Sequence, residues 1–152
     1  LTAEGAKVLE YNVRFGDPEC QVILPRLQSD LLEIMLAVIH GELAGQTVTW
    51  YDRHAACVVM ASAGYPGPYQ TGKIITGLDQ AAAMPEVCVF HAGTATQGKN
   101  VVTAGGRVLA VTAWGETLQA ALAKAYRGVS AIHFDGAHYR TDIAHRAKAV
   151  SQ

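Results

Sequence analysis

Residues 100–129 read NVVTAGGRVLAVTAWGETLQAALAKAYRGV, and this stretch decides the fold class. The runs Asn100–Thr103 and Arg107–Ala113 favour strands, and the small residues Ala104-Gly105-Gly106 separate them. The apolar residues that follow recur at helical spacing on one stripe: Leu118, Ala121, Leu122, Ala125, Tyr126 and Val129. Strands followed by one amphipathic helix predict an α+β fold.

Further strand-like runs lie upstream at Ala56–Ser62, Lys73–Thr76 and Val87–Ala92. The segments 64–68 and 97–100 between runs are rich in Gly, Pro and Asn, which is turn chemistry. We therefore predict a small domain at residues 53–147, made mainly of antiparallel strands with one principal helix.

The sequence before residue 53 has a different pattern. Residues 7–15 alternate between apolar and polar side chains, which predicts a strand. Gly16 ends it, and Asp17-Pro18 predicts a short helix with Asp17 as N-cap and Pro18 at its first position, ending before Pro25.

A second helix is expected from Asp30, which with Glu33 makes a capping-box pattern, to Gly41. Its residues are apolar on almost every side, so we expect it to be buried on most sides, partly against other regions of a longer polypeptide. The chain begins at Leu1 within a patterned stretch, which also favours a piece of a longer protein. Residues 45–52 read as a linker.

Composition excludes several classes of partner. The chain has 152 residues, half of them hydrophobic, which is enough for a sizeable core. Lys and Arg number 12 against 13 Asp and Glu, without blocks of one sign, so we expect no nucleic-acid or membrane partner. Three cysteines without C-x-x-C spacing indicate free thiols and a cytoplasmic protein.

The polar face of residues 7–15 carries Glu10, Asn12 and Arg14. Alternate residues of a strand lie about 6.6 Å apart, so these side chains can converge on one site. Carboxylate and amide oxygens suit Mg²⁺ or Mn²⁺, and Arg14 can hold a phosphate or carboxylate. On the pattern alone, the alternative is a solvated face of an edge strand.

The turn after this face adds a second feature. A helix starting near Asp17 aims backbone N–H groups at the same region, so a cation site and an anion site would lie side by side. The alternative is an ordinary turn between a strand and a helix.

The run Glu10–Glu19 resembles the end of the ATP-grasp domain of phosphoribosylamine-glycine ligases, also called glycinamide ribonucleotide synthetases. Further stretches resemble family motifs in the family's order, and they are Val22–Leu27, Gly64–Gly67, Phe90–Thr94, Gly105–Leu109 and Tyr139–Ile143. The resemblance covers essentially the whole chain. It implies that residues 1–50 end an ATP-grasp domain and that residues 53–147 form the carboxy-terminal domain of the ligase.

The resemblance also implies a reaction, in which ATP drives the joining of glycine to 5-phosphoribosylamine in purine synthesis. It implies that Glu10 and Asn12 hold magnesium. Arg14 would stabilise the acyl phosphate, and Asp17 would either contact substrate or cap the helix. Arg107, in a glycine-rich segment, would bind the ribose phosphate, or the segment is a turn that leads into a core strand.

The chain departs from the family pattern at several positions, and two other functions compete with the ligase. Pro68 and Thr71 stand where the family often has an acidic and a basic residue, and Ala144-His145 replaces glycine and an aromatic residue. One rival is a non-catalytic β-rich module for binding or assembly. Another is an ATP-grasp ligase for a different purine intermediate. A fragment of the ligase is expected to be inactive alone.

Overall fold

The computed structural model describes residues 3–148 and has an α+β fold, as predicted. The helices are α1 (Cys20–Ile23), α2 (Leu31–His40), α3 (Leu78–Ala82), α4 (Leu118–Ala131) and α5 (His145–Lys148), with 3₁₀ turns η1 (Leu24–Arg26) and η2 (Leu43–Gly45). The strands are β1 (His54–Ala61), β2 (Val87–His91), β3 (Thr94–Gln97), β4 (Asn100–Thr103) and β5 (Arg107–Gly115).

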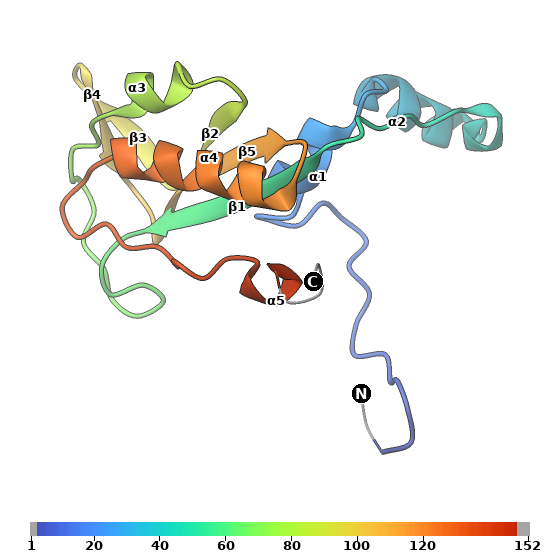
Figure 1. Ribbon diagram of the computed structural model, residues 1–152, viewed down its shortest axis with the longest axis horizontal. Coiled ribbons are helices and arrows are strands. Elements are labelled where there is room, and N and C mark those ends of the chain that lie inside the picture. Colours follow the sequence, from blue (N-terminus) through green and yellow to red (C-terminus); the bar gives the residue numbers. More distant parts are fainter. Residues whose placement is uncertain (1–2, 149–152) are drawn as a thin grey trace.

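The main sheet has the order β1-β5-β2 and is antiparallel throughout. Val111 of β5 lies opposite Val58 of β1 and Val89 of β2, which fixes the register of all three strands. The principal helix α4 lies across this sheet and packs on β1 and β5 (Figure 1). Strands β3 and β4 form a separate two-stranded hairpin.

The core lies between the sheet and α4. Strand β1 alternates, so that Ala56, Val58 and Met60 are buried on the helix side. The buried residues of α4 are Ala121, Leu122, Ala125, Gly128 and Val129. Full burial of a Val or Leu side chain stabilises a fold by about 1.5–3 kcal/mol, so residues such as Val58 and Leu122 each contribute on that scale.

Local signals predicted several elements correctly. The strands predicted at 56–62, 87–92, 100–103 and 107–113 and the helix with the 118–129 stripe are confirmed. Helix α2 is confirmed as well, since the Asp30 carboxylate accepts the N–H of Leu32 at 2.7 Å and Gly41 ends the helix with a φ of 73°.

Three local predictions are wrong. Residues 7–15 are not a strand, because no other segment among residues 3–148 pairs with them. Residues 73–76 form only isolated bridges, because Ile74 pairs with Val102 whereas Thr76 pairs with His133. The helix predicted to start at Asp17-Pro18 begins at Cys20 instead, with Glu19 at its N-cap.

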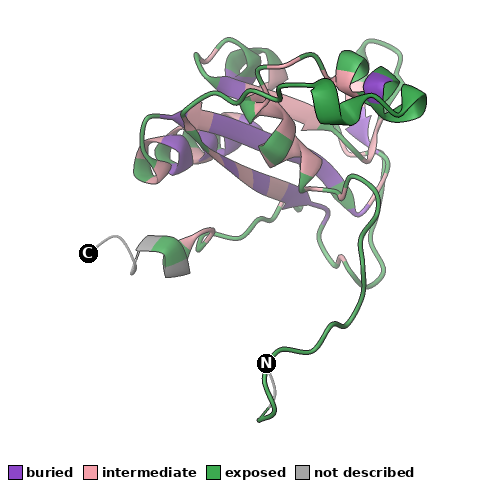
Figure 2. Ribbon diagram, turned by 90° about the vertical axis from the view of Figure 1, so that its right-hand side faces the viewer, coloured by how far each residue is buried: buried purple, intermediate pink, exposed green. Residues whose placement is uncertain are grey.

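Helix α2 is mostly exposed within this chain, and the burial expected for it against other regions of a longer polypeptide stays a prediction. Only Ala37 is buried, and the side chain of Ile39 is 75% exposed. Most of the exposed large hydrophobic side chains of the described chain lie in residues 8–51, whereas the sheet and α4 hold the buried residues (Figure 2). Within residues 3–148, no helix is both long enough and apolar enough to cross a membrane.

Arg53 fastens the amino-terminal region to the end of the sheet. Its guanidinium stacks on the rings of Tyr51 and Trp114, at 4.3 and 4.6 Å from their centroids. It also donates a hydrogen bond to the carbonyl oxygen of Pro25 in η1. Through these cation–π contacts and this hydrogen bond, Arg53 connects η1, the linker at residues 45–52 and β5.

Gly77 offers a test of this packing. It precedes α3 with a φ of +81°, and a Cβ there would clash with the backbone oxygen of Ala131. We expect Gly77→Ala to lower the free energy of unfolding by about 3 kcal/mol, because left-handed strain and backbone displacement add. Urea unfolding measures this loss.

Gly98→Ala is the matched control for Gly77→Ala. Its φ of +60° carries the same strain, but no atom lies within 4 Å of the added Cβ. We expect a loss of about 1 kcal/mol there. Equal losses in the two variants would contradict the close approach of α3 to the end of α4.

Candidate functional site

The side chains of Glu10, Asn12 and Arg14 contact one another although the segment that carries them is not a strand. The amide of Asn12 donates to Glu10 Oε1 at 3.2 Å, and the guanidinium of Arg14 donates to Asn12 Oδ1. All three side chains are exposed, as are their apolar neighbours Leu9 and Val13. The segment that carries them projects away from the sheet and α4 (Figure 1).

The oxygens on this segment fit a hard divalent cation in kind but not in number. Glu10 offers a carboxylate and Asn12 an amide oxygen, which are ligands that Mg²⁺ accepts. No group of three or more His, Cys, Asp or Glu side chains within residues 3–148 is placed to hold a metal ion. Glu10 therefore has no pair of acidic, His or Cys partners among these residues with which to build such a site.

Asp17 and Arg107 are brought together although 90 residues separate them. Arg107 Nη2 lies 3.2 Å from Asp17 Oδ2, and Nη1 donates to the Asp17 carbonyl oxygen at 2.8 Å. The other carboxylate oxygen of Asp17 accepts a hydrogen bond from Gln21 at 2.8 Å. Asp17 therefore anchors the chain ahead of α1 to the first residue of β5 and does not cap a helix.

The glycine-rich segment before Arg107 is packed closely. A Cβ on Gly106 would clash with the ring of Tyr65, and a Cβ on Gly105 would lie 2.9 Å from the Cα of Gly93. Ser62 holds the same segment, because its hydroxyl donates to the Gly105 carbonyl oxygen at 2.9 Å and its N–H to that of Gly106 at 2.8 Å. Three of the motifs identified in the sequence thus meet at one end of the main sheet.

A fourth motif, residues 139–143, is bound to α4. The guanidinium of Arg140 forms two hydrogen bonds of 2.8 Å with the carboxylate of Asp142, which lowers the pKa of Asp142 to about 2. The Tyr126 hydroxyl donates to the Arg140 carbonyl oxygen at 3.0 Å and accepts the N–H of Ile143 at 3.2 Å. These bonds give the motif a fixed course along the helix.

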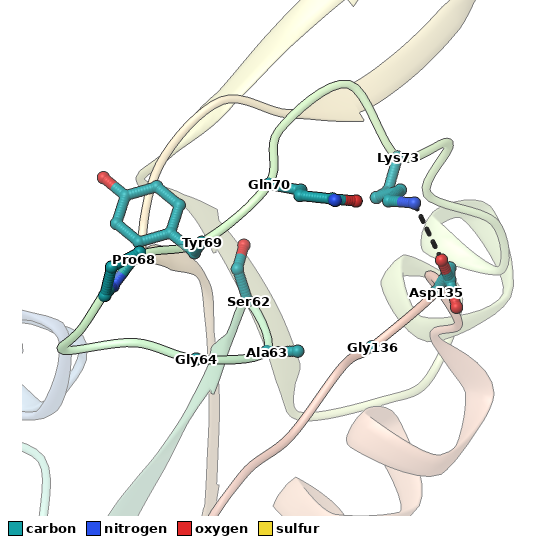
Figure 3. A pocket seen from close by; sticks show the side chains of 9 residues that line it. All are labelled: Ser62, Ala63, Gly64, Pro68, Tyr69, Gln70, Lys73, Asp135 and Gly136. Carbon is teal, nitrogen blue, oxygen red and sulfur yellow. Dashed lines mark ion pairs between the residues drawn. The ribbon is translucent and has the colours of Figure 1, made fainter.

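Sequence reasoning missed a cavity of about 590 Å³ at the end of β1. Lys73 and Asp135 form an ion pair of 2.9 Å on one wall, and Ser62 and the turn after it form another (Figure 3). Thr71, where a basic residue is often expected, does not line the cavity, but Lys73 does. Asp135 lies 62 residues further along the chain, so no local pattern connects it to Lys73.

Comparison with known proteins gives one consistent result. Residues 55–146 match the family described as phosphoribosylglycinamide synthetase, C domain. The chain is 57% identical to the trifunctional purine biosynthetic protein adenosine-3 of Gallus gallus, over 98% of this chain and 15% of that protein. It is 52% identical to the phosphoribosylamine-glycine ligase of Rhodopirellula baltica, over 97% of this chain and 34% of that protein.

A solved structure is also similar to this chain over most of its length. The crystal structure of the phosphoribosylamine-glycine ligase from Thermotoga maritima superimposes with a TM-score of 0.69 and 37% identity, over 89% of this chain and 32% of that chain. This chain therefore spans about a third or less of the length of these proteins.

The contact between Arg107 and Asp17 can be tested by amide exchange. We expect Arg107→Gln to speed exchange of the Cys20 N–H, which bonds to the Gly16 carbonyl oxygen, by roughly 2–5-fold. A half-exposed ion pair contributes at most about 1 kcal/mol, so the fold itself should persist. Arg127→Gln, an exposed position on α4, is the control, and equal exchange in both variants would show that Arg107 does not hold this segment.

Proposed function

Since this chain belongs to the phosphoribosylglycinamide synthetase family, we propose that it is the carboxy-terminal part of a phosphoribosylamine-glycine ligase. Residues 1–50 end an ATP-grasp domain and residues 53–147 form the carboxy-terminal domain. The supporting observation is the extent of the match, since 97% of the chain aligns with the Rhodopirellula ligase although the family domain covers only residues 55–146. The similarity thus includes the exposed amino-terminal region.

The complete enzyme is a cytoplasmic ligase that forms glycinamide ribonucleotide from glycine, 5-phosphoribosylamine and ATP. The glycine carboxylate attacks the γ-phosphorus of ATP, and ADP leaves. The amine nitrogen of 5-phosphoribosylamine then attacks the acyl carbon, and phosphate leaves with loss of a proton from nitrogen. Negative charge gathers on phosphoryl oxygens in both steps, so positioned cations do most of the catalytic work.

The residues of this chain have distinct tasks in that reaction. Glu10 and Asn12 would hold Mg²⁺ or Mn²⁺, which would offset the charge of the ATP phosphates. Arg14 lies next to them, because its guanidinium donates a hydrogen bond to Asn12 Oδ1. From there it can hold the acyl phosphate. Arg107 contributes to substrate binding, and Asp17 orients Arg107 through the two contacts between them.

The isolated chain should be inactive as a ligase. An ATP-grasp site holds the nucleotide between two lobes, and the row of Glu10, Asn12 and Arg14 is open to solvent on the side where a second lobe would lie. The exposed apolar side chains of residues 8–51 fit the same interpretation, because such surface is normally covered by protein. The remainder of the ligase is therefore the expected partner.

The rival functions have different support. The exposed apolar surface of residues 8–51 also suits a non-catalytic assembly module, which would not need the side chains of Glu10, Asn12 and Arg14. A ligase for another purine intermediate is disfavoured, because relatives aligned along the whole chain are named phosphoribosylamine-glycine ligases. Catalytic dependence on Glu10 separates the enzyme from the module.

We expect Glu10→Gln in the complete ligase to lower turnover by roughly 100-fold or more, because the amide keeps the shape of the side chain but loses the charge. The magnesium concentration for half-maximal rate should rise as well. Glycine-dependent ADP release measures both quantities, and thermal melting should change little because the side chain is exposed.

Glu116→Gln is the matched control, since Glu116 is an exposed carboxylate in the loop before α4. It should leave turnover and magnesium dependence unchanged. If Glu10→Gln and Asn12→Ala both behave like this control, the metal assignment is wrong.

A further inference from the structure

The cavity at the end of β1 has the size and position of a ligand site. Its volume of about 590 Å³ lies within the range of roughly 300–1,000 Å³ that is usual for small-molecule sites. Three separate segments line it: the end of β1 with its following turn, residues 68–73, and residues 135–136. Figure 3 shows the side chains of Ser62, Gln70 and Lys73 gathered around the same space.

The cavity carries more hydrogen-bond donors than its own contacts use. The ammonium group of Lys73 bonds to one oxygen of Asp135, which leaves donor hydrogens for another partner. The side chain of Gln70 points toward Lys73, and it makes no hydrogen bond to residues 3–148. The backbone N–H groups of Ala63 and Gly64 likewise lack an acceptor within that range.

These groups favour an anion that also bears hydroxyl groups. A lysine with a free amide beside it suits phosphate oxygens, which accept several hydrogen bonds. The carboxylate of Asp135 can only accept, as carboxylates do toward the hydroxyls of a ribose. The Asp135 side chain is 79% exposed, so a ligand can reach it without opening the fold.

We propose that this cavity binds a sugar phosphate, with its phosphate on Lys73 and Gln70 and its hydroxyls on Asp135. The proposal rests on the proposed function, whose amine substrate is a pentose 5-phosphate. The cavity adjoins the segment of Arg107, because Ser62 lines the cavity and binds the carbonyl oxygens of Gly105 and Gly106. Arg107 and Lys73 each retain donor hydrogens beside their ion pairs with Asp17 and Asp135.

Isothermal titration of the 152-residue chain tests this site with three probes: ribose 5-phosphate, inorganic phosphate and ribose. Ribose 5-phosphate should bind more tightly than either of the other two. Lys73→Met should weaken its binding by at least about tenfold, since the phosphate loses its cation. Asp135→Asn should weaken binding of ribose 5-phosphate but not that of inorganic phosphate.

Lys99→Met is the matched control, because Lys99 is exposed in the β3–β4 turn and lies outside the cavity lining. It should bind all probes like the wild type. Circular dichroism establishes that each variant is folded, and Gln70→Ala replaces Lys73→Met if that variant does not fold. The site is overturned if the cavity variants bind like the control, or if ribose 5-phosphate binds no better than inorganic phosphate or ribose.

This result is separable from the ligase proposal. The titration requires no ATP, glycine or catalysis, so absence of ribose 5-phosphate binding beside normal ligase turnover in the complete enzyme would overturn the cavity assignment alone. Conversely, binding at the cavity with no ligase activity in the complete enzyme would leave the site and remove the proposed reaction.

Discussion

The central position of β5 is the constraint on which the rest of the structure depends. It hydrogen-bonds to β1 on one side and to β2 on the other, and α4 packs across it. Both ends of the strand hold the amino-terminal region in place. At its start Arg107 binds Asp17, and near its end Trp114 stacks against Arg53, whose guanidinium also binds η1. A single buried strand thus sets where both attachments lie.

These two attachments give the amino-terminal region a defined place on the domain. The region itself contributes little apolar surface to the core, because α2 and the extended residues before Gly16 are largely exposed. It is positioned by polar and cation–π contacts together with the half-buried apolar residues of α1 and η1, which pack on β1. Such contacts fix a position at modest gain in stability.

Sequence patterns predicted the elements whose causes are local. The cap at Asp30, the stop at Gly41 and the apolar stripe of α4 each depend on residues within a few positions of one another, and all three are present. Residues 7–15 were predicted wrongly, because alternation indicates an extended chain but does not supply a neighbouring strand. Helix α3 and strand β3 were missed because α3 has no side-chain cap and β3 is mostly exposed and polar.

The candidate site also has some features that local sequence patterns predict and others that depend on residues far apart in the chain. The row of Glu10, Asn12 and Arg14 is a feature of spacing, and its side chains do contact one another. The role expected of Asp17 as a cap was wrong because a partner 90 residues away engages its carboxylate. Lys73 and Asp135 likewise meet only through the course of the chain after β1 and after α4, which no local pattern contains.

The central claim is that this chain supplies one side of a ligase site that the remainder of the enzyme completes. Glycine-dependent ADP release from the isolated chain and from the complete ligase, at equal concentration and with 5-phosphoribosylamine present, tests it most directly. The account predicts turnover and glycinamide ribonucleotide from the complete enzyme and neither from the isolated chain. Turnover by the isolated chain on the order of 1 per second, or none by the complete enzyme, would contradict it.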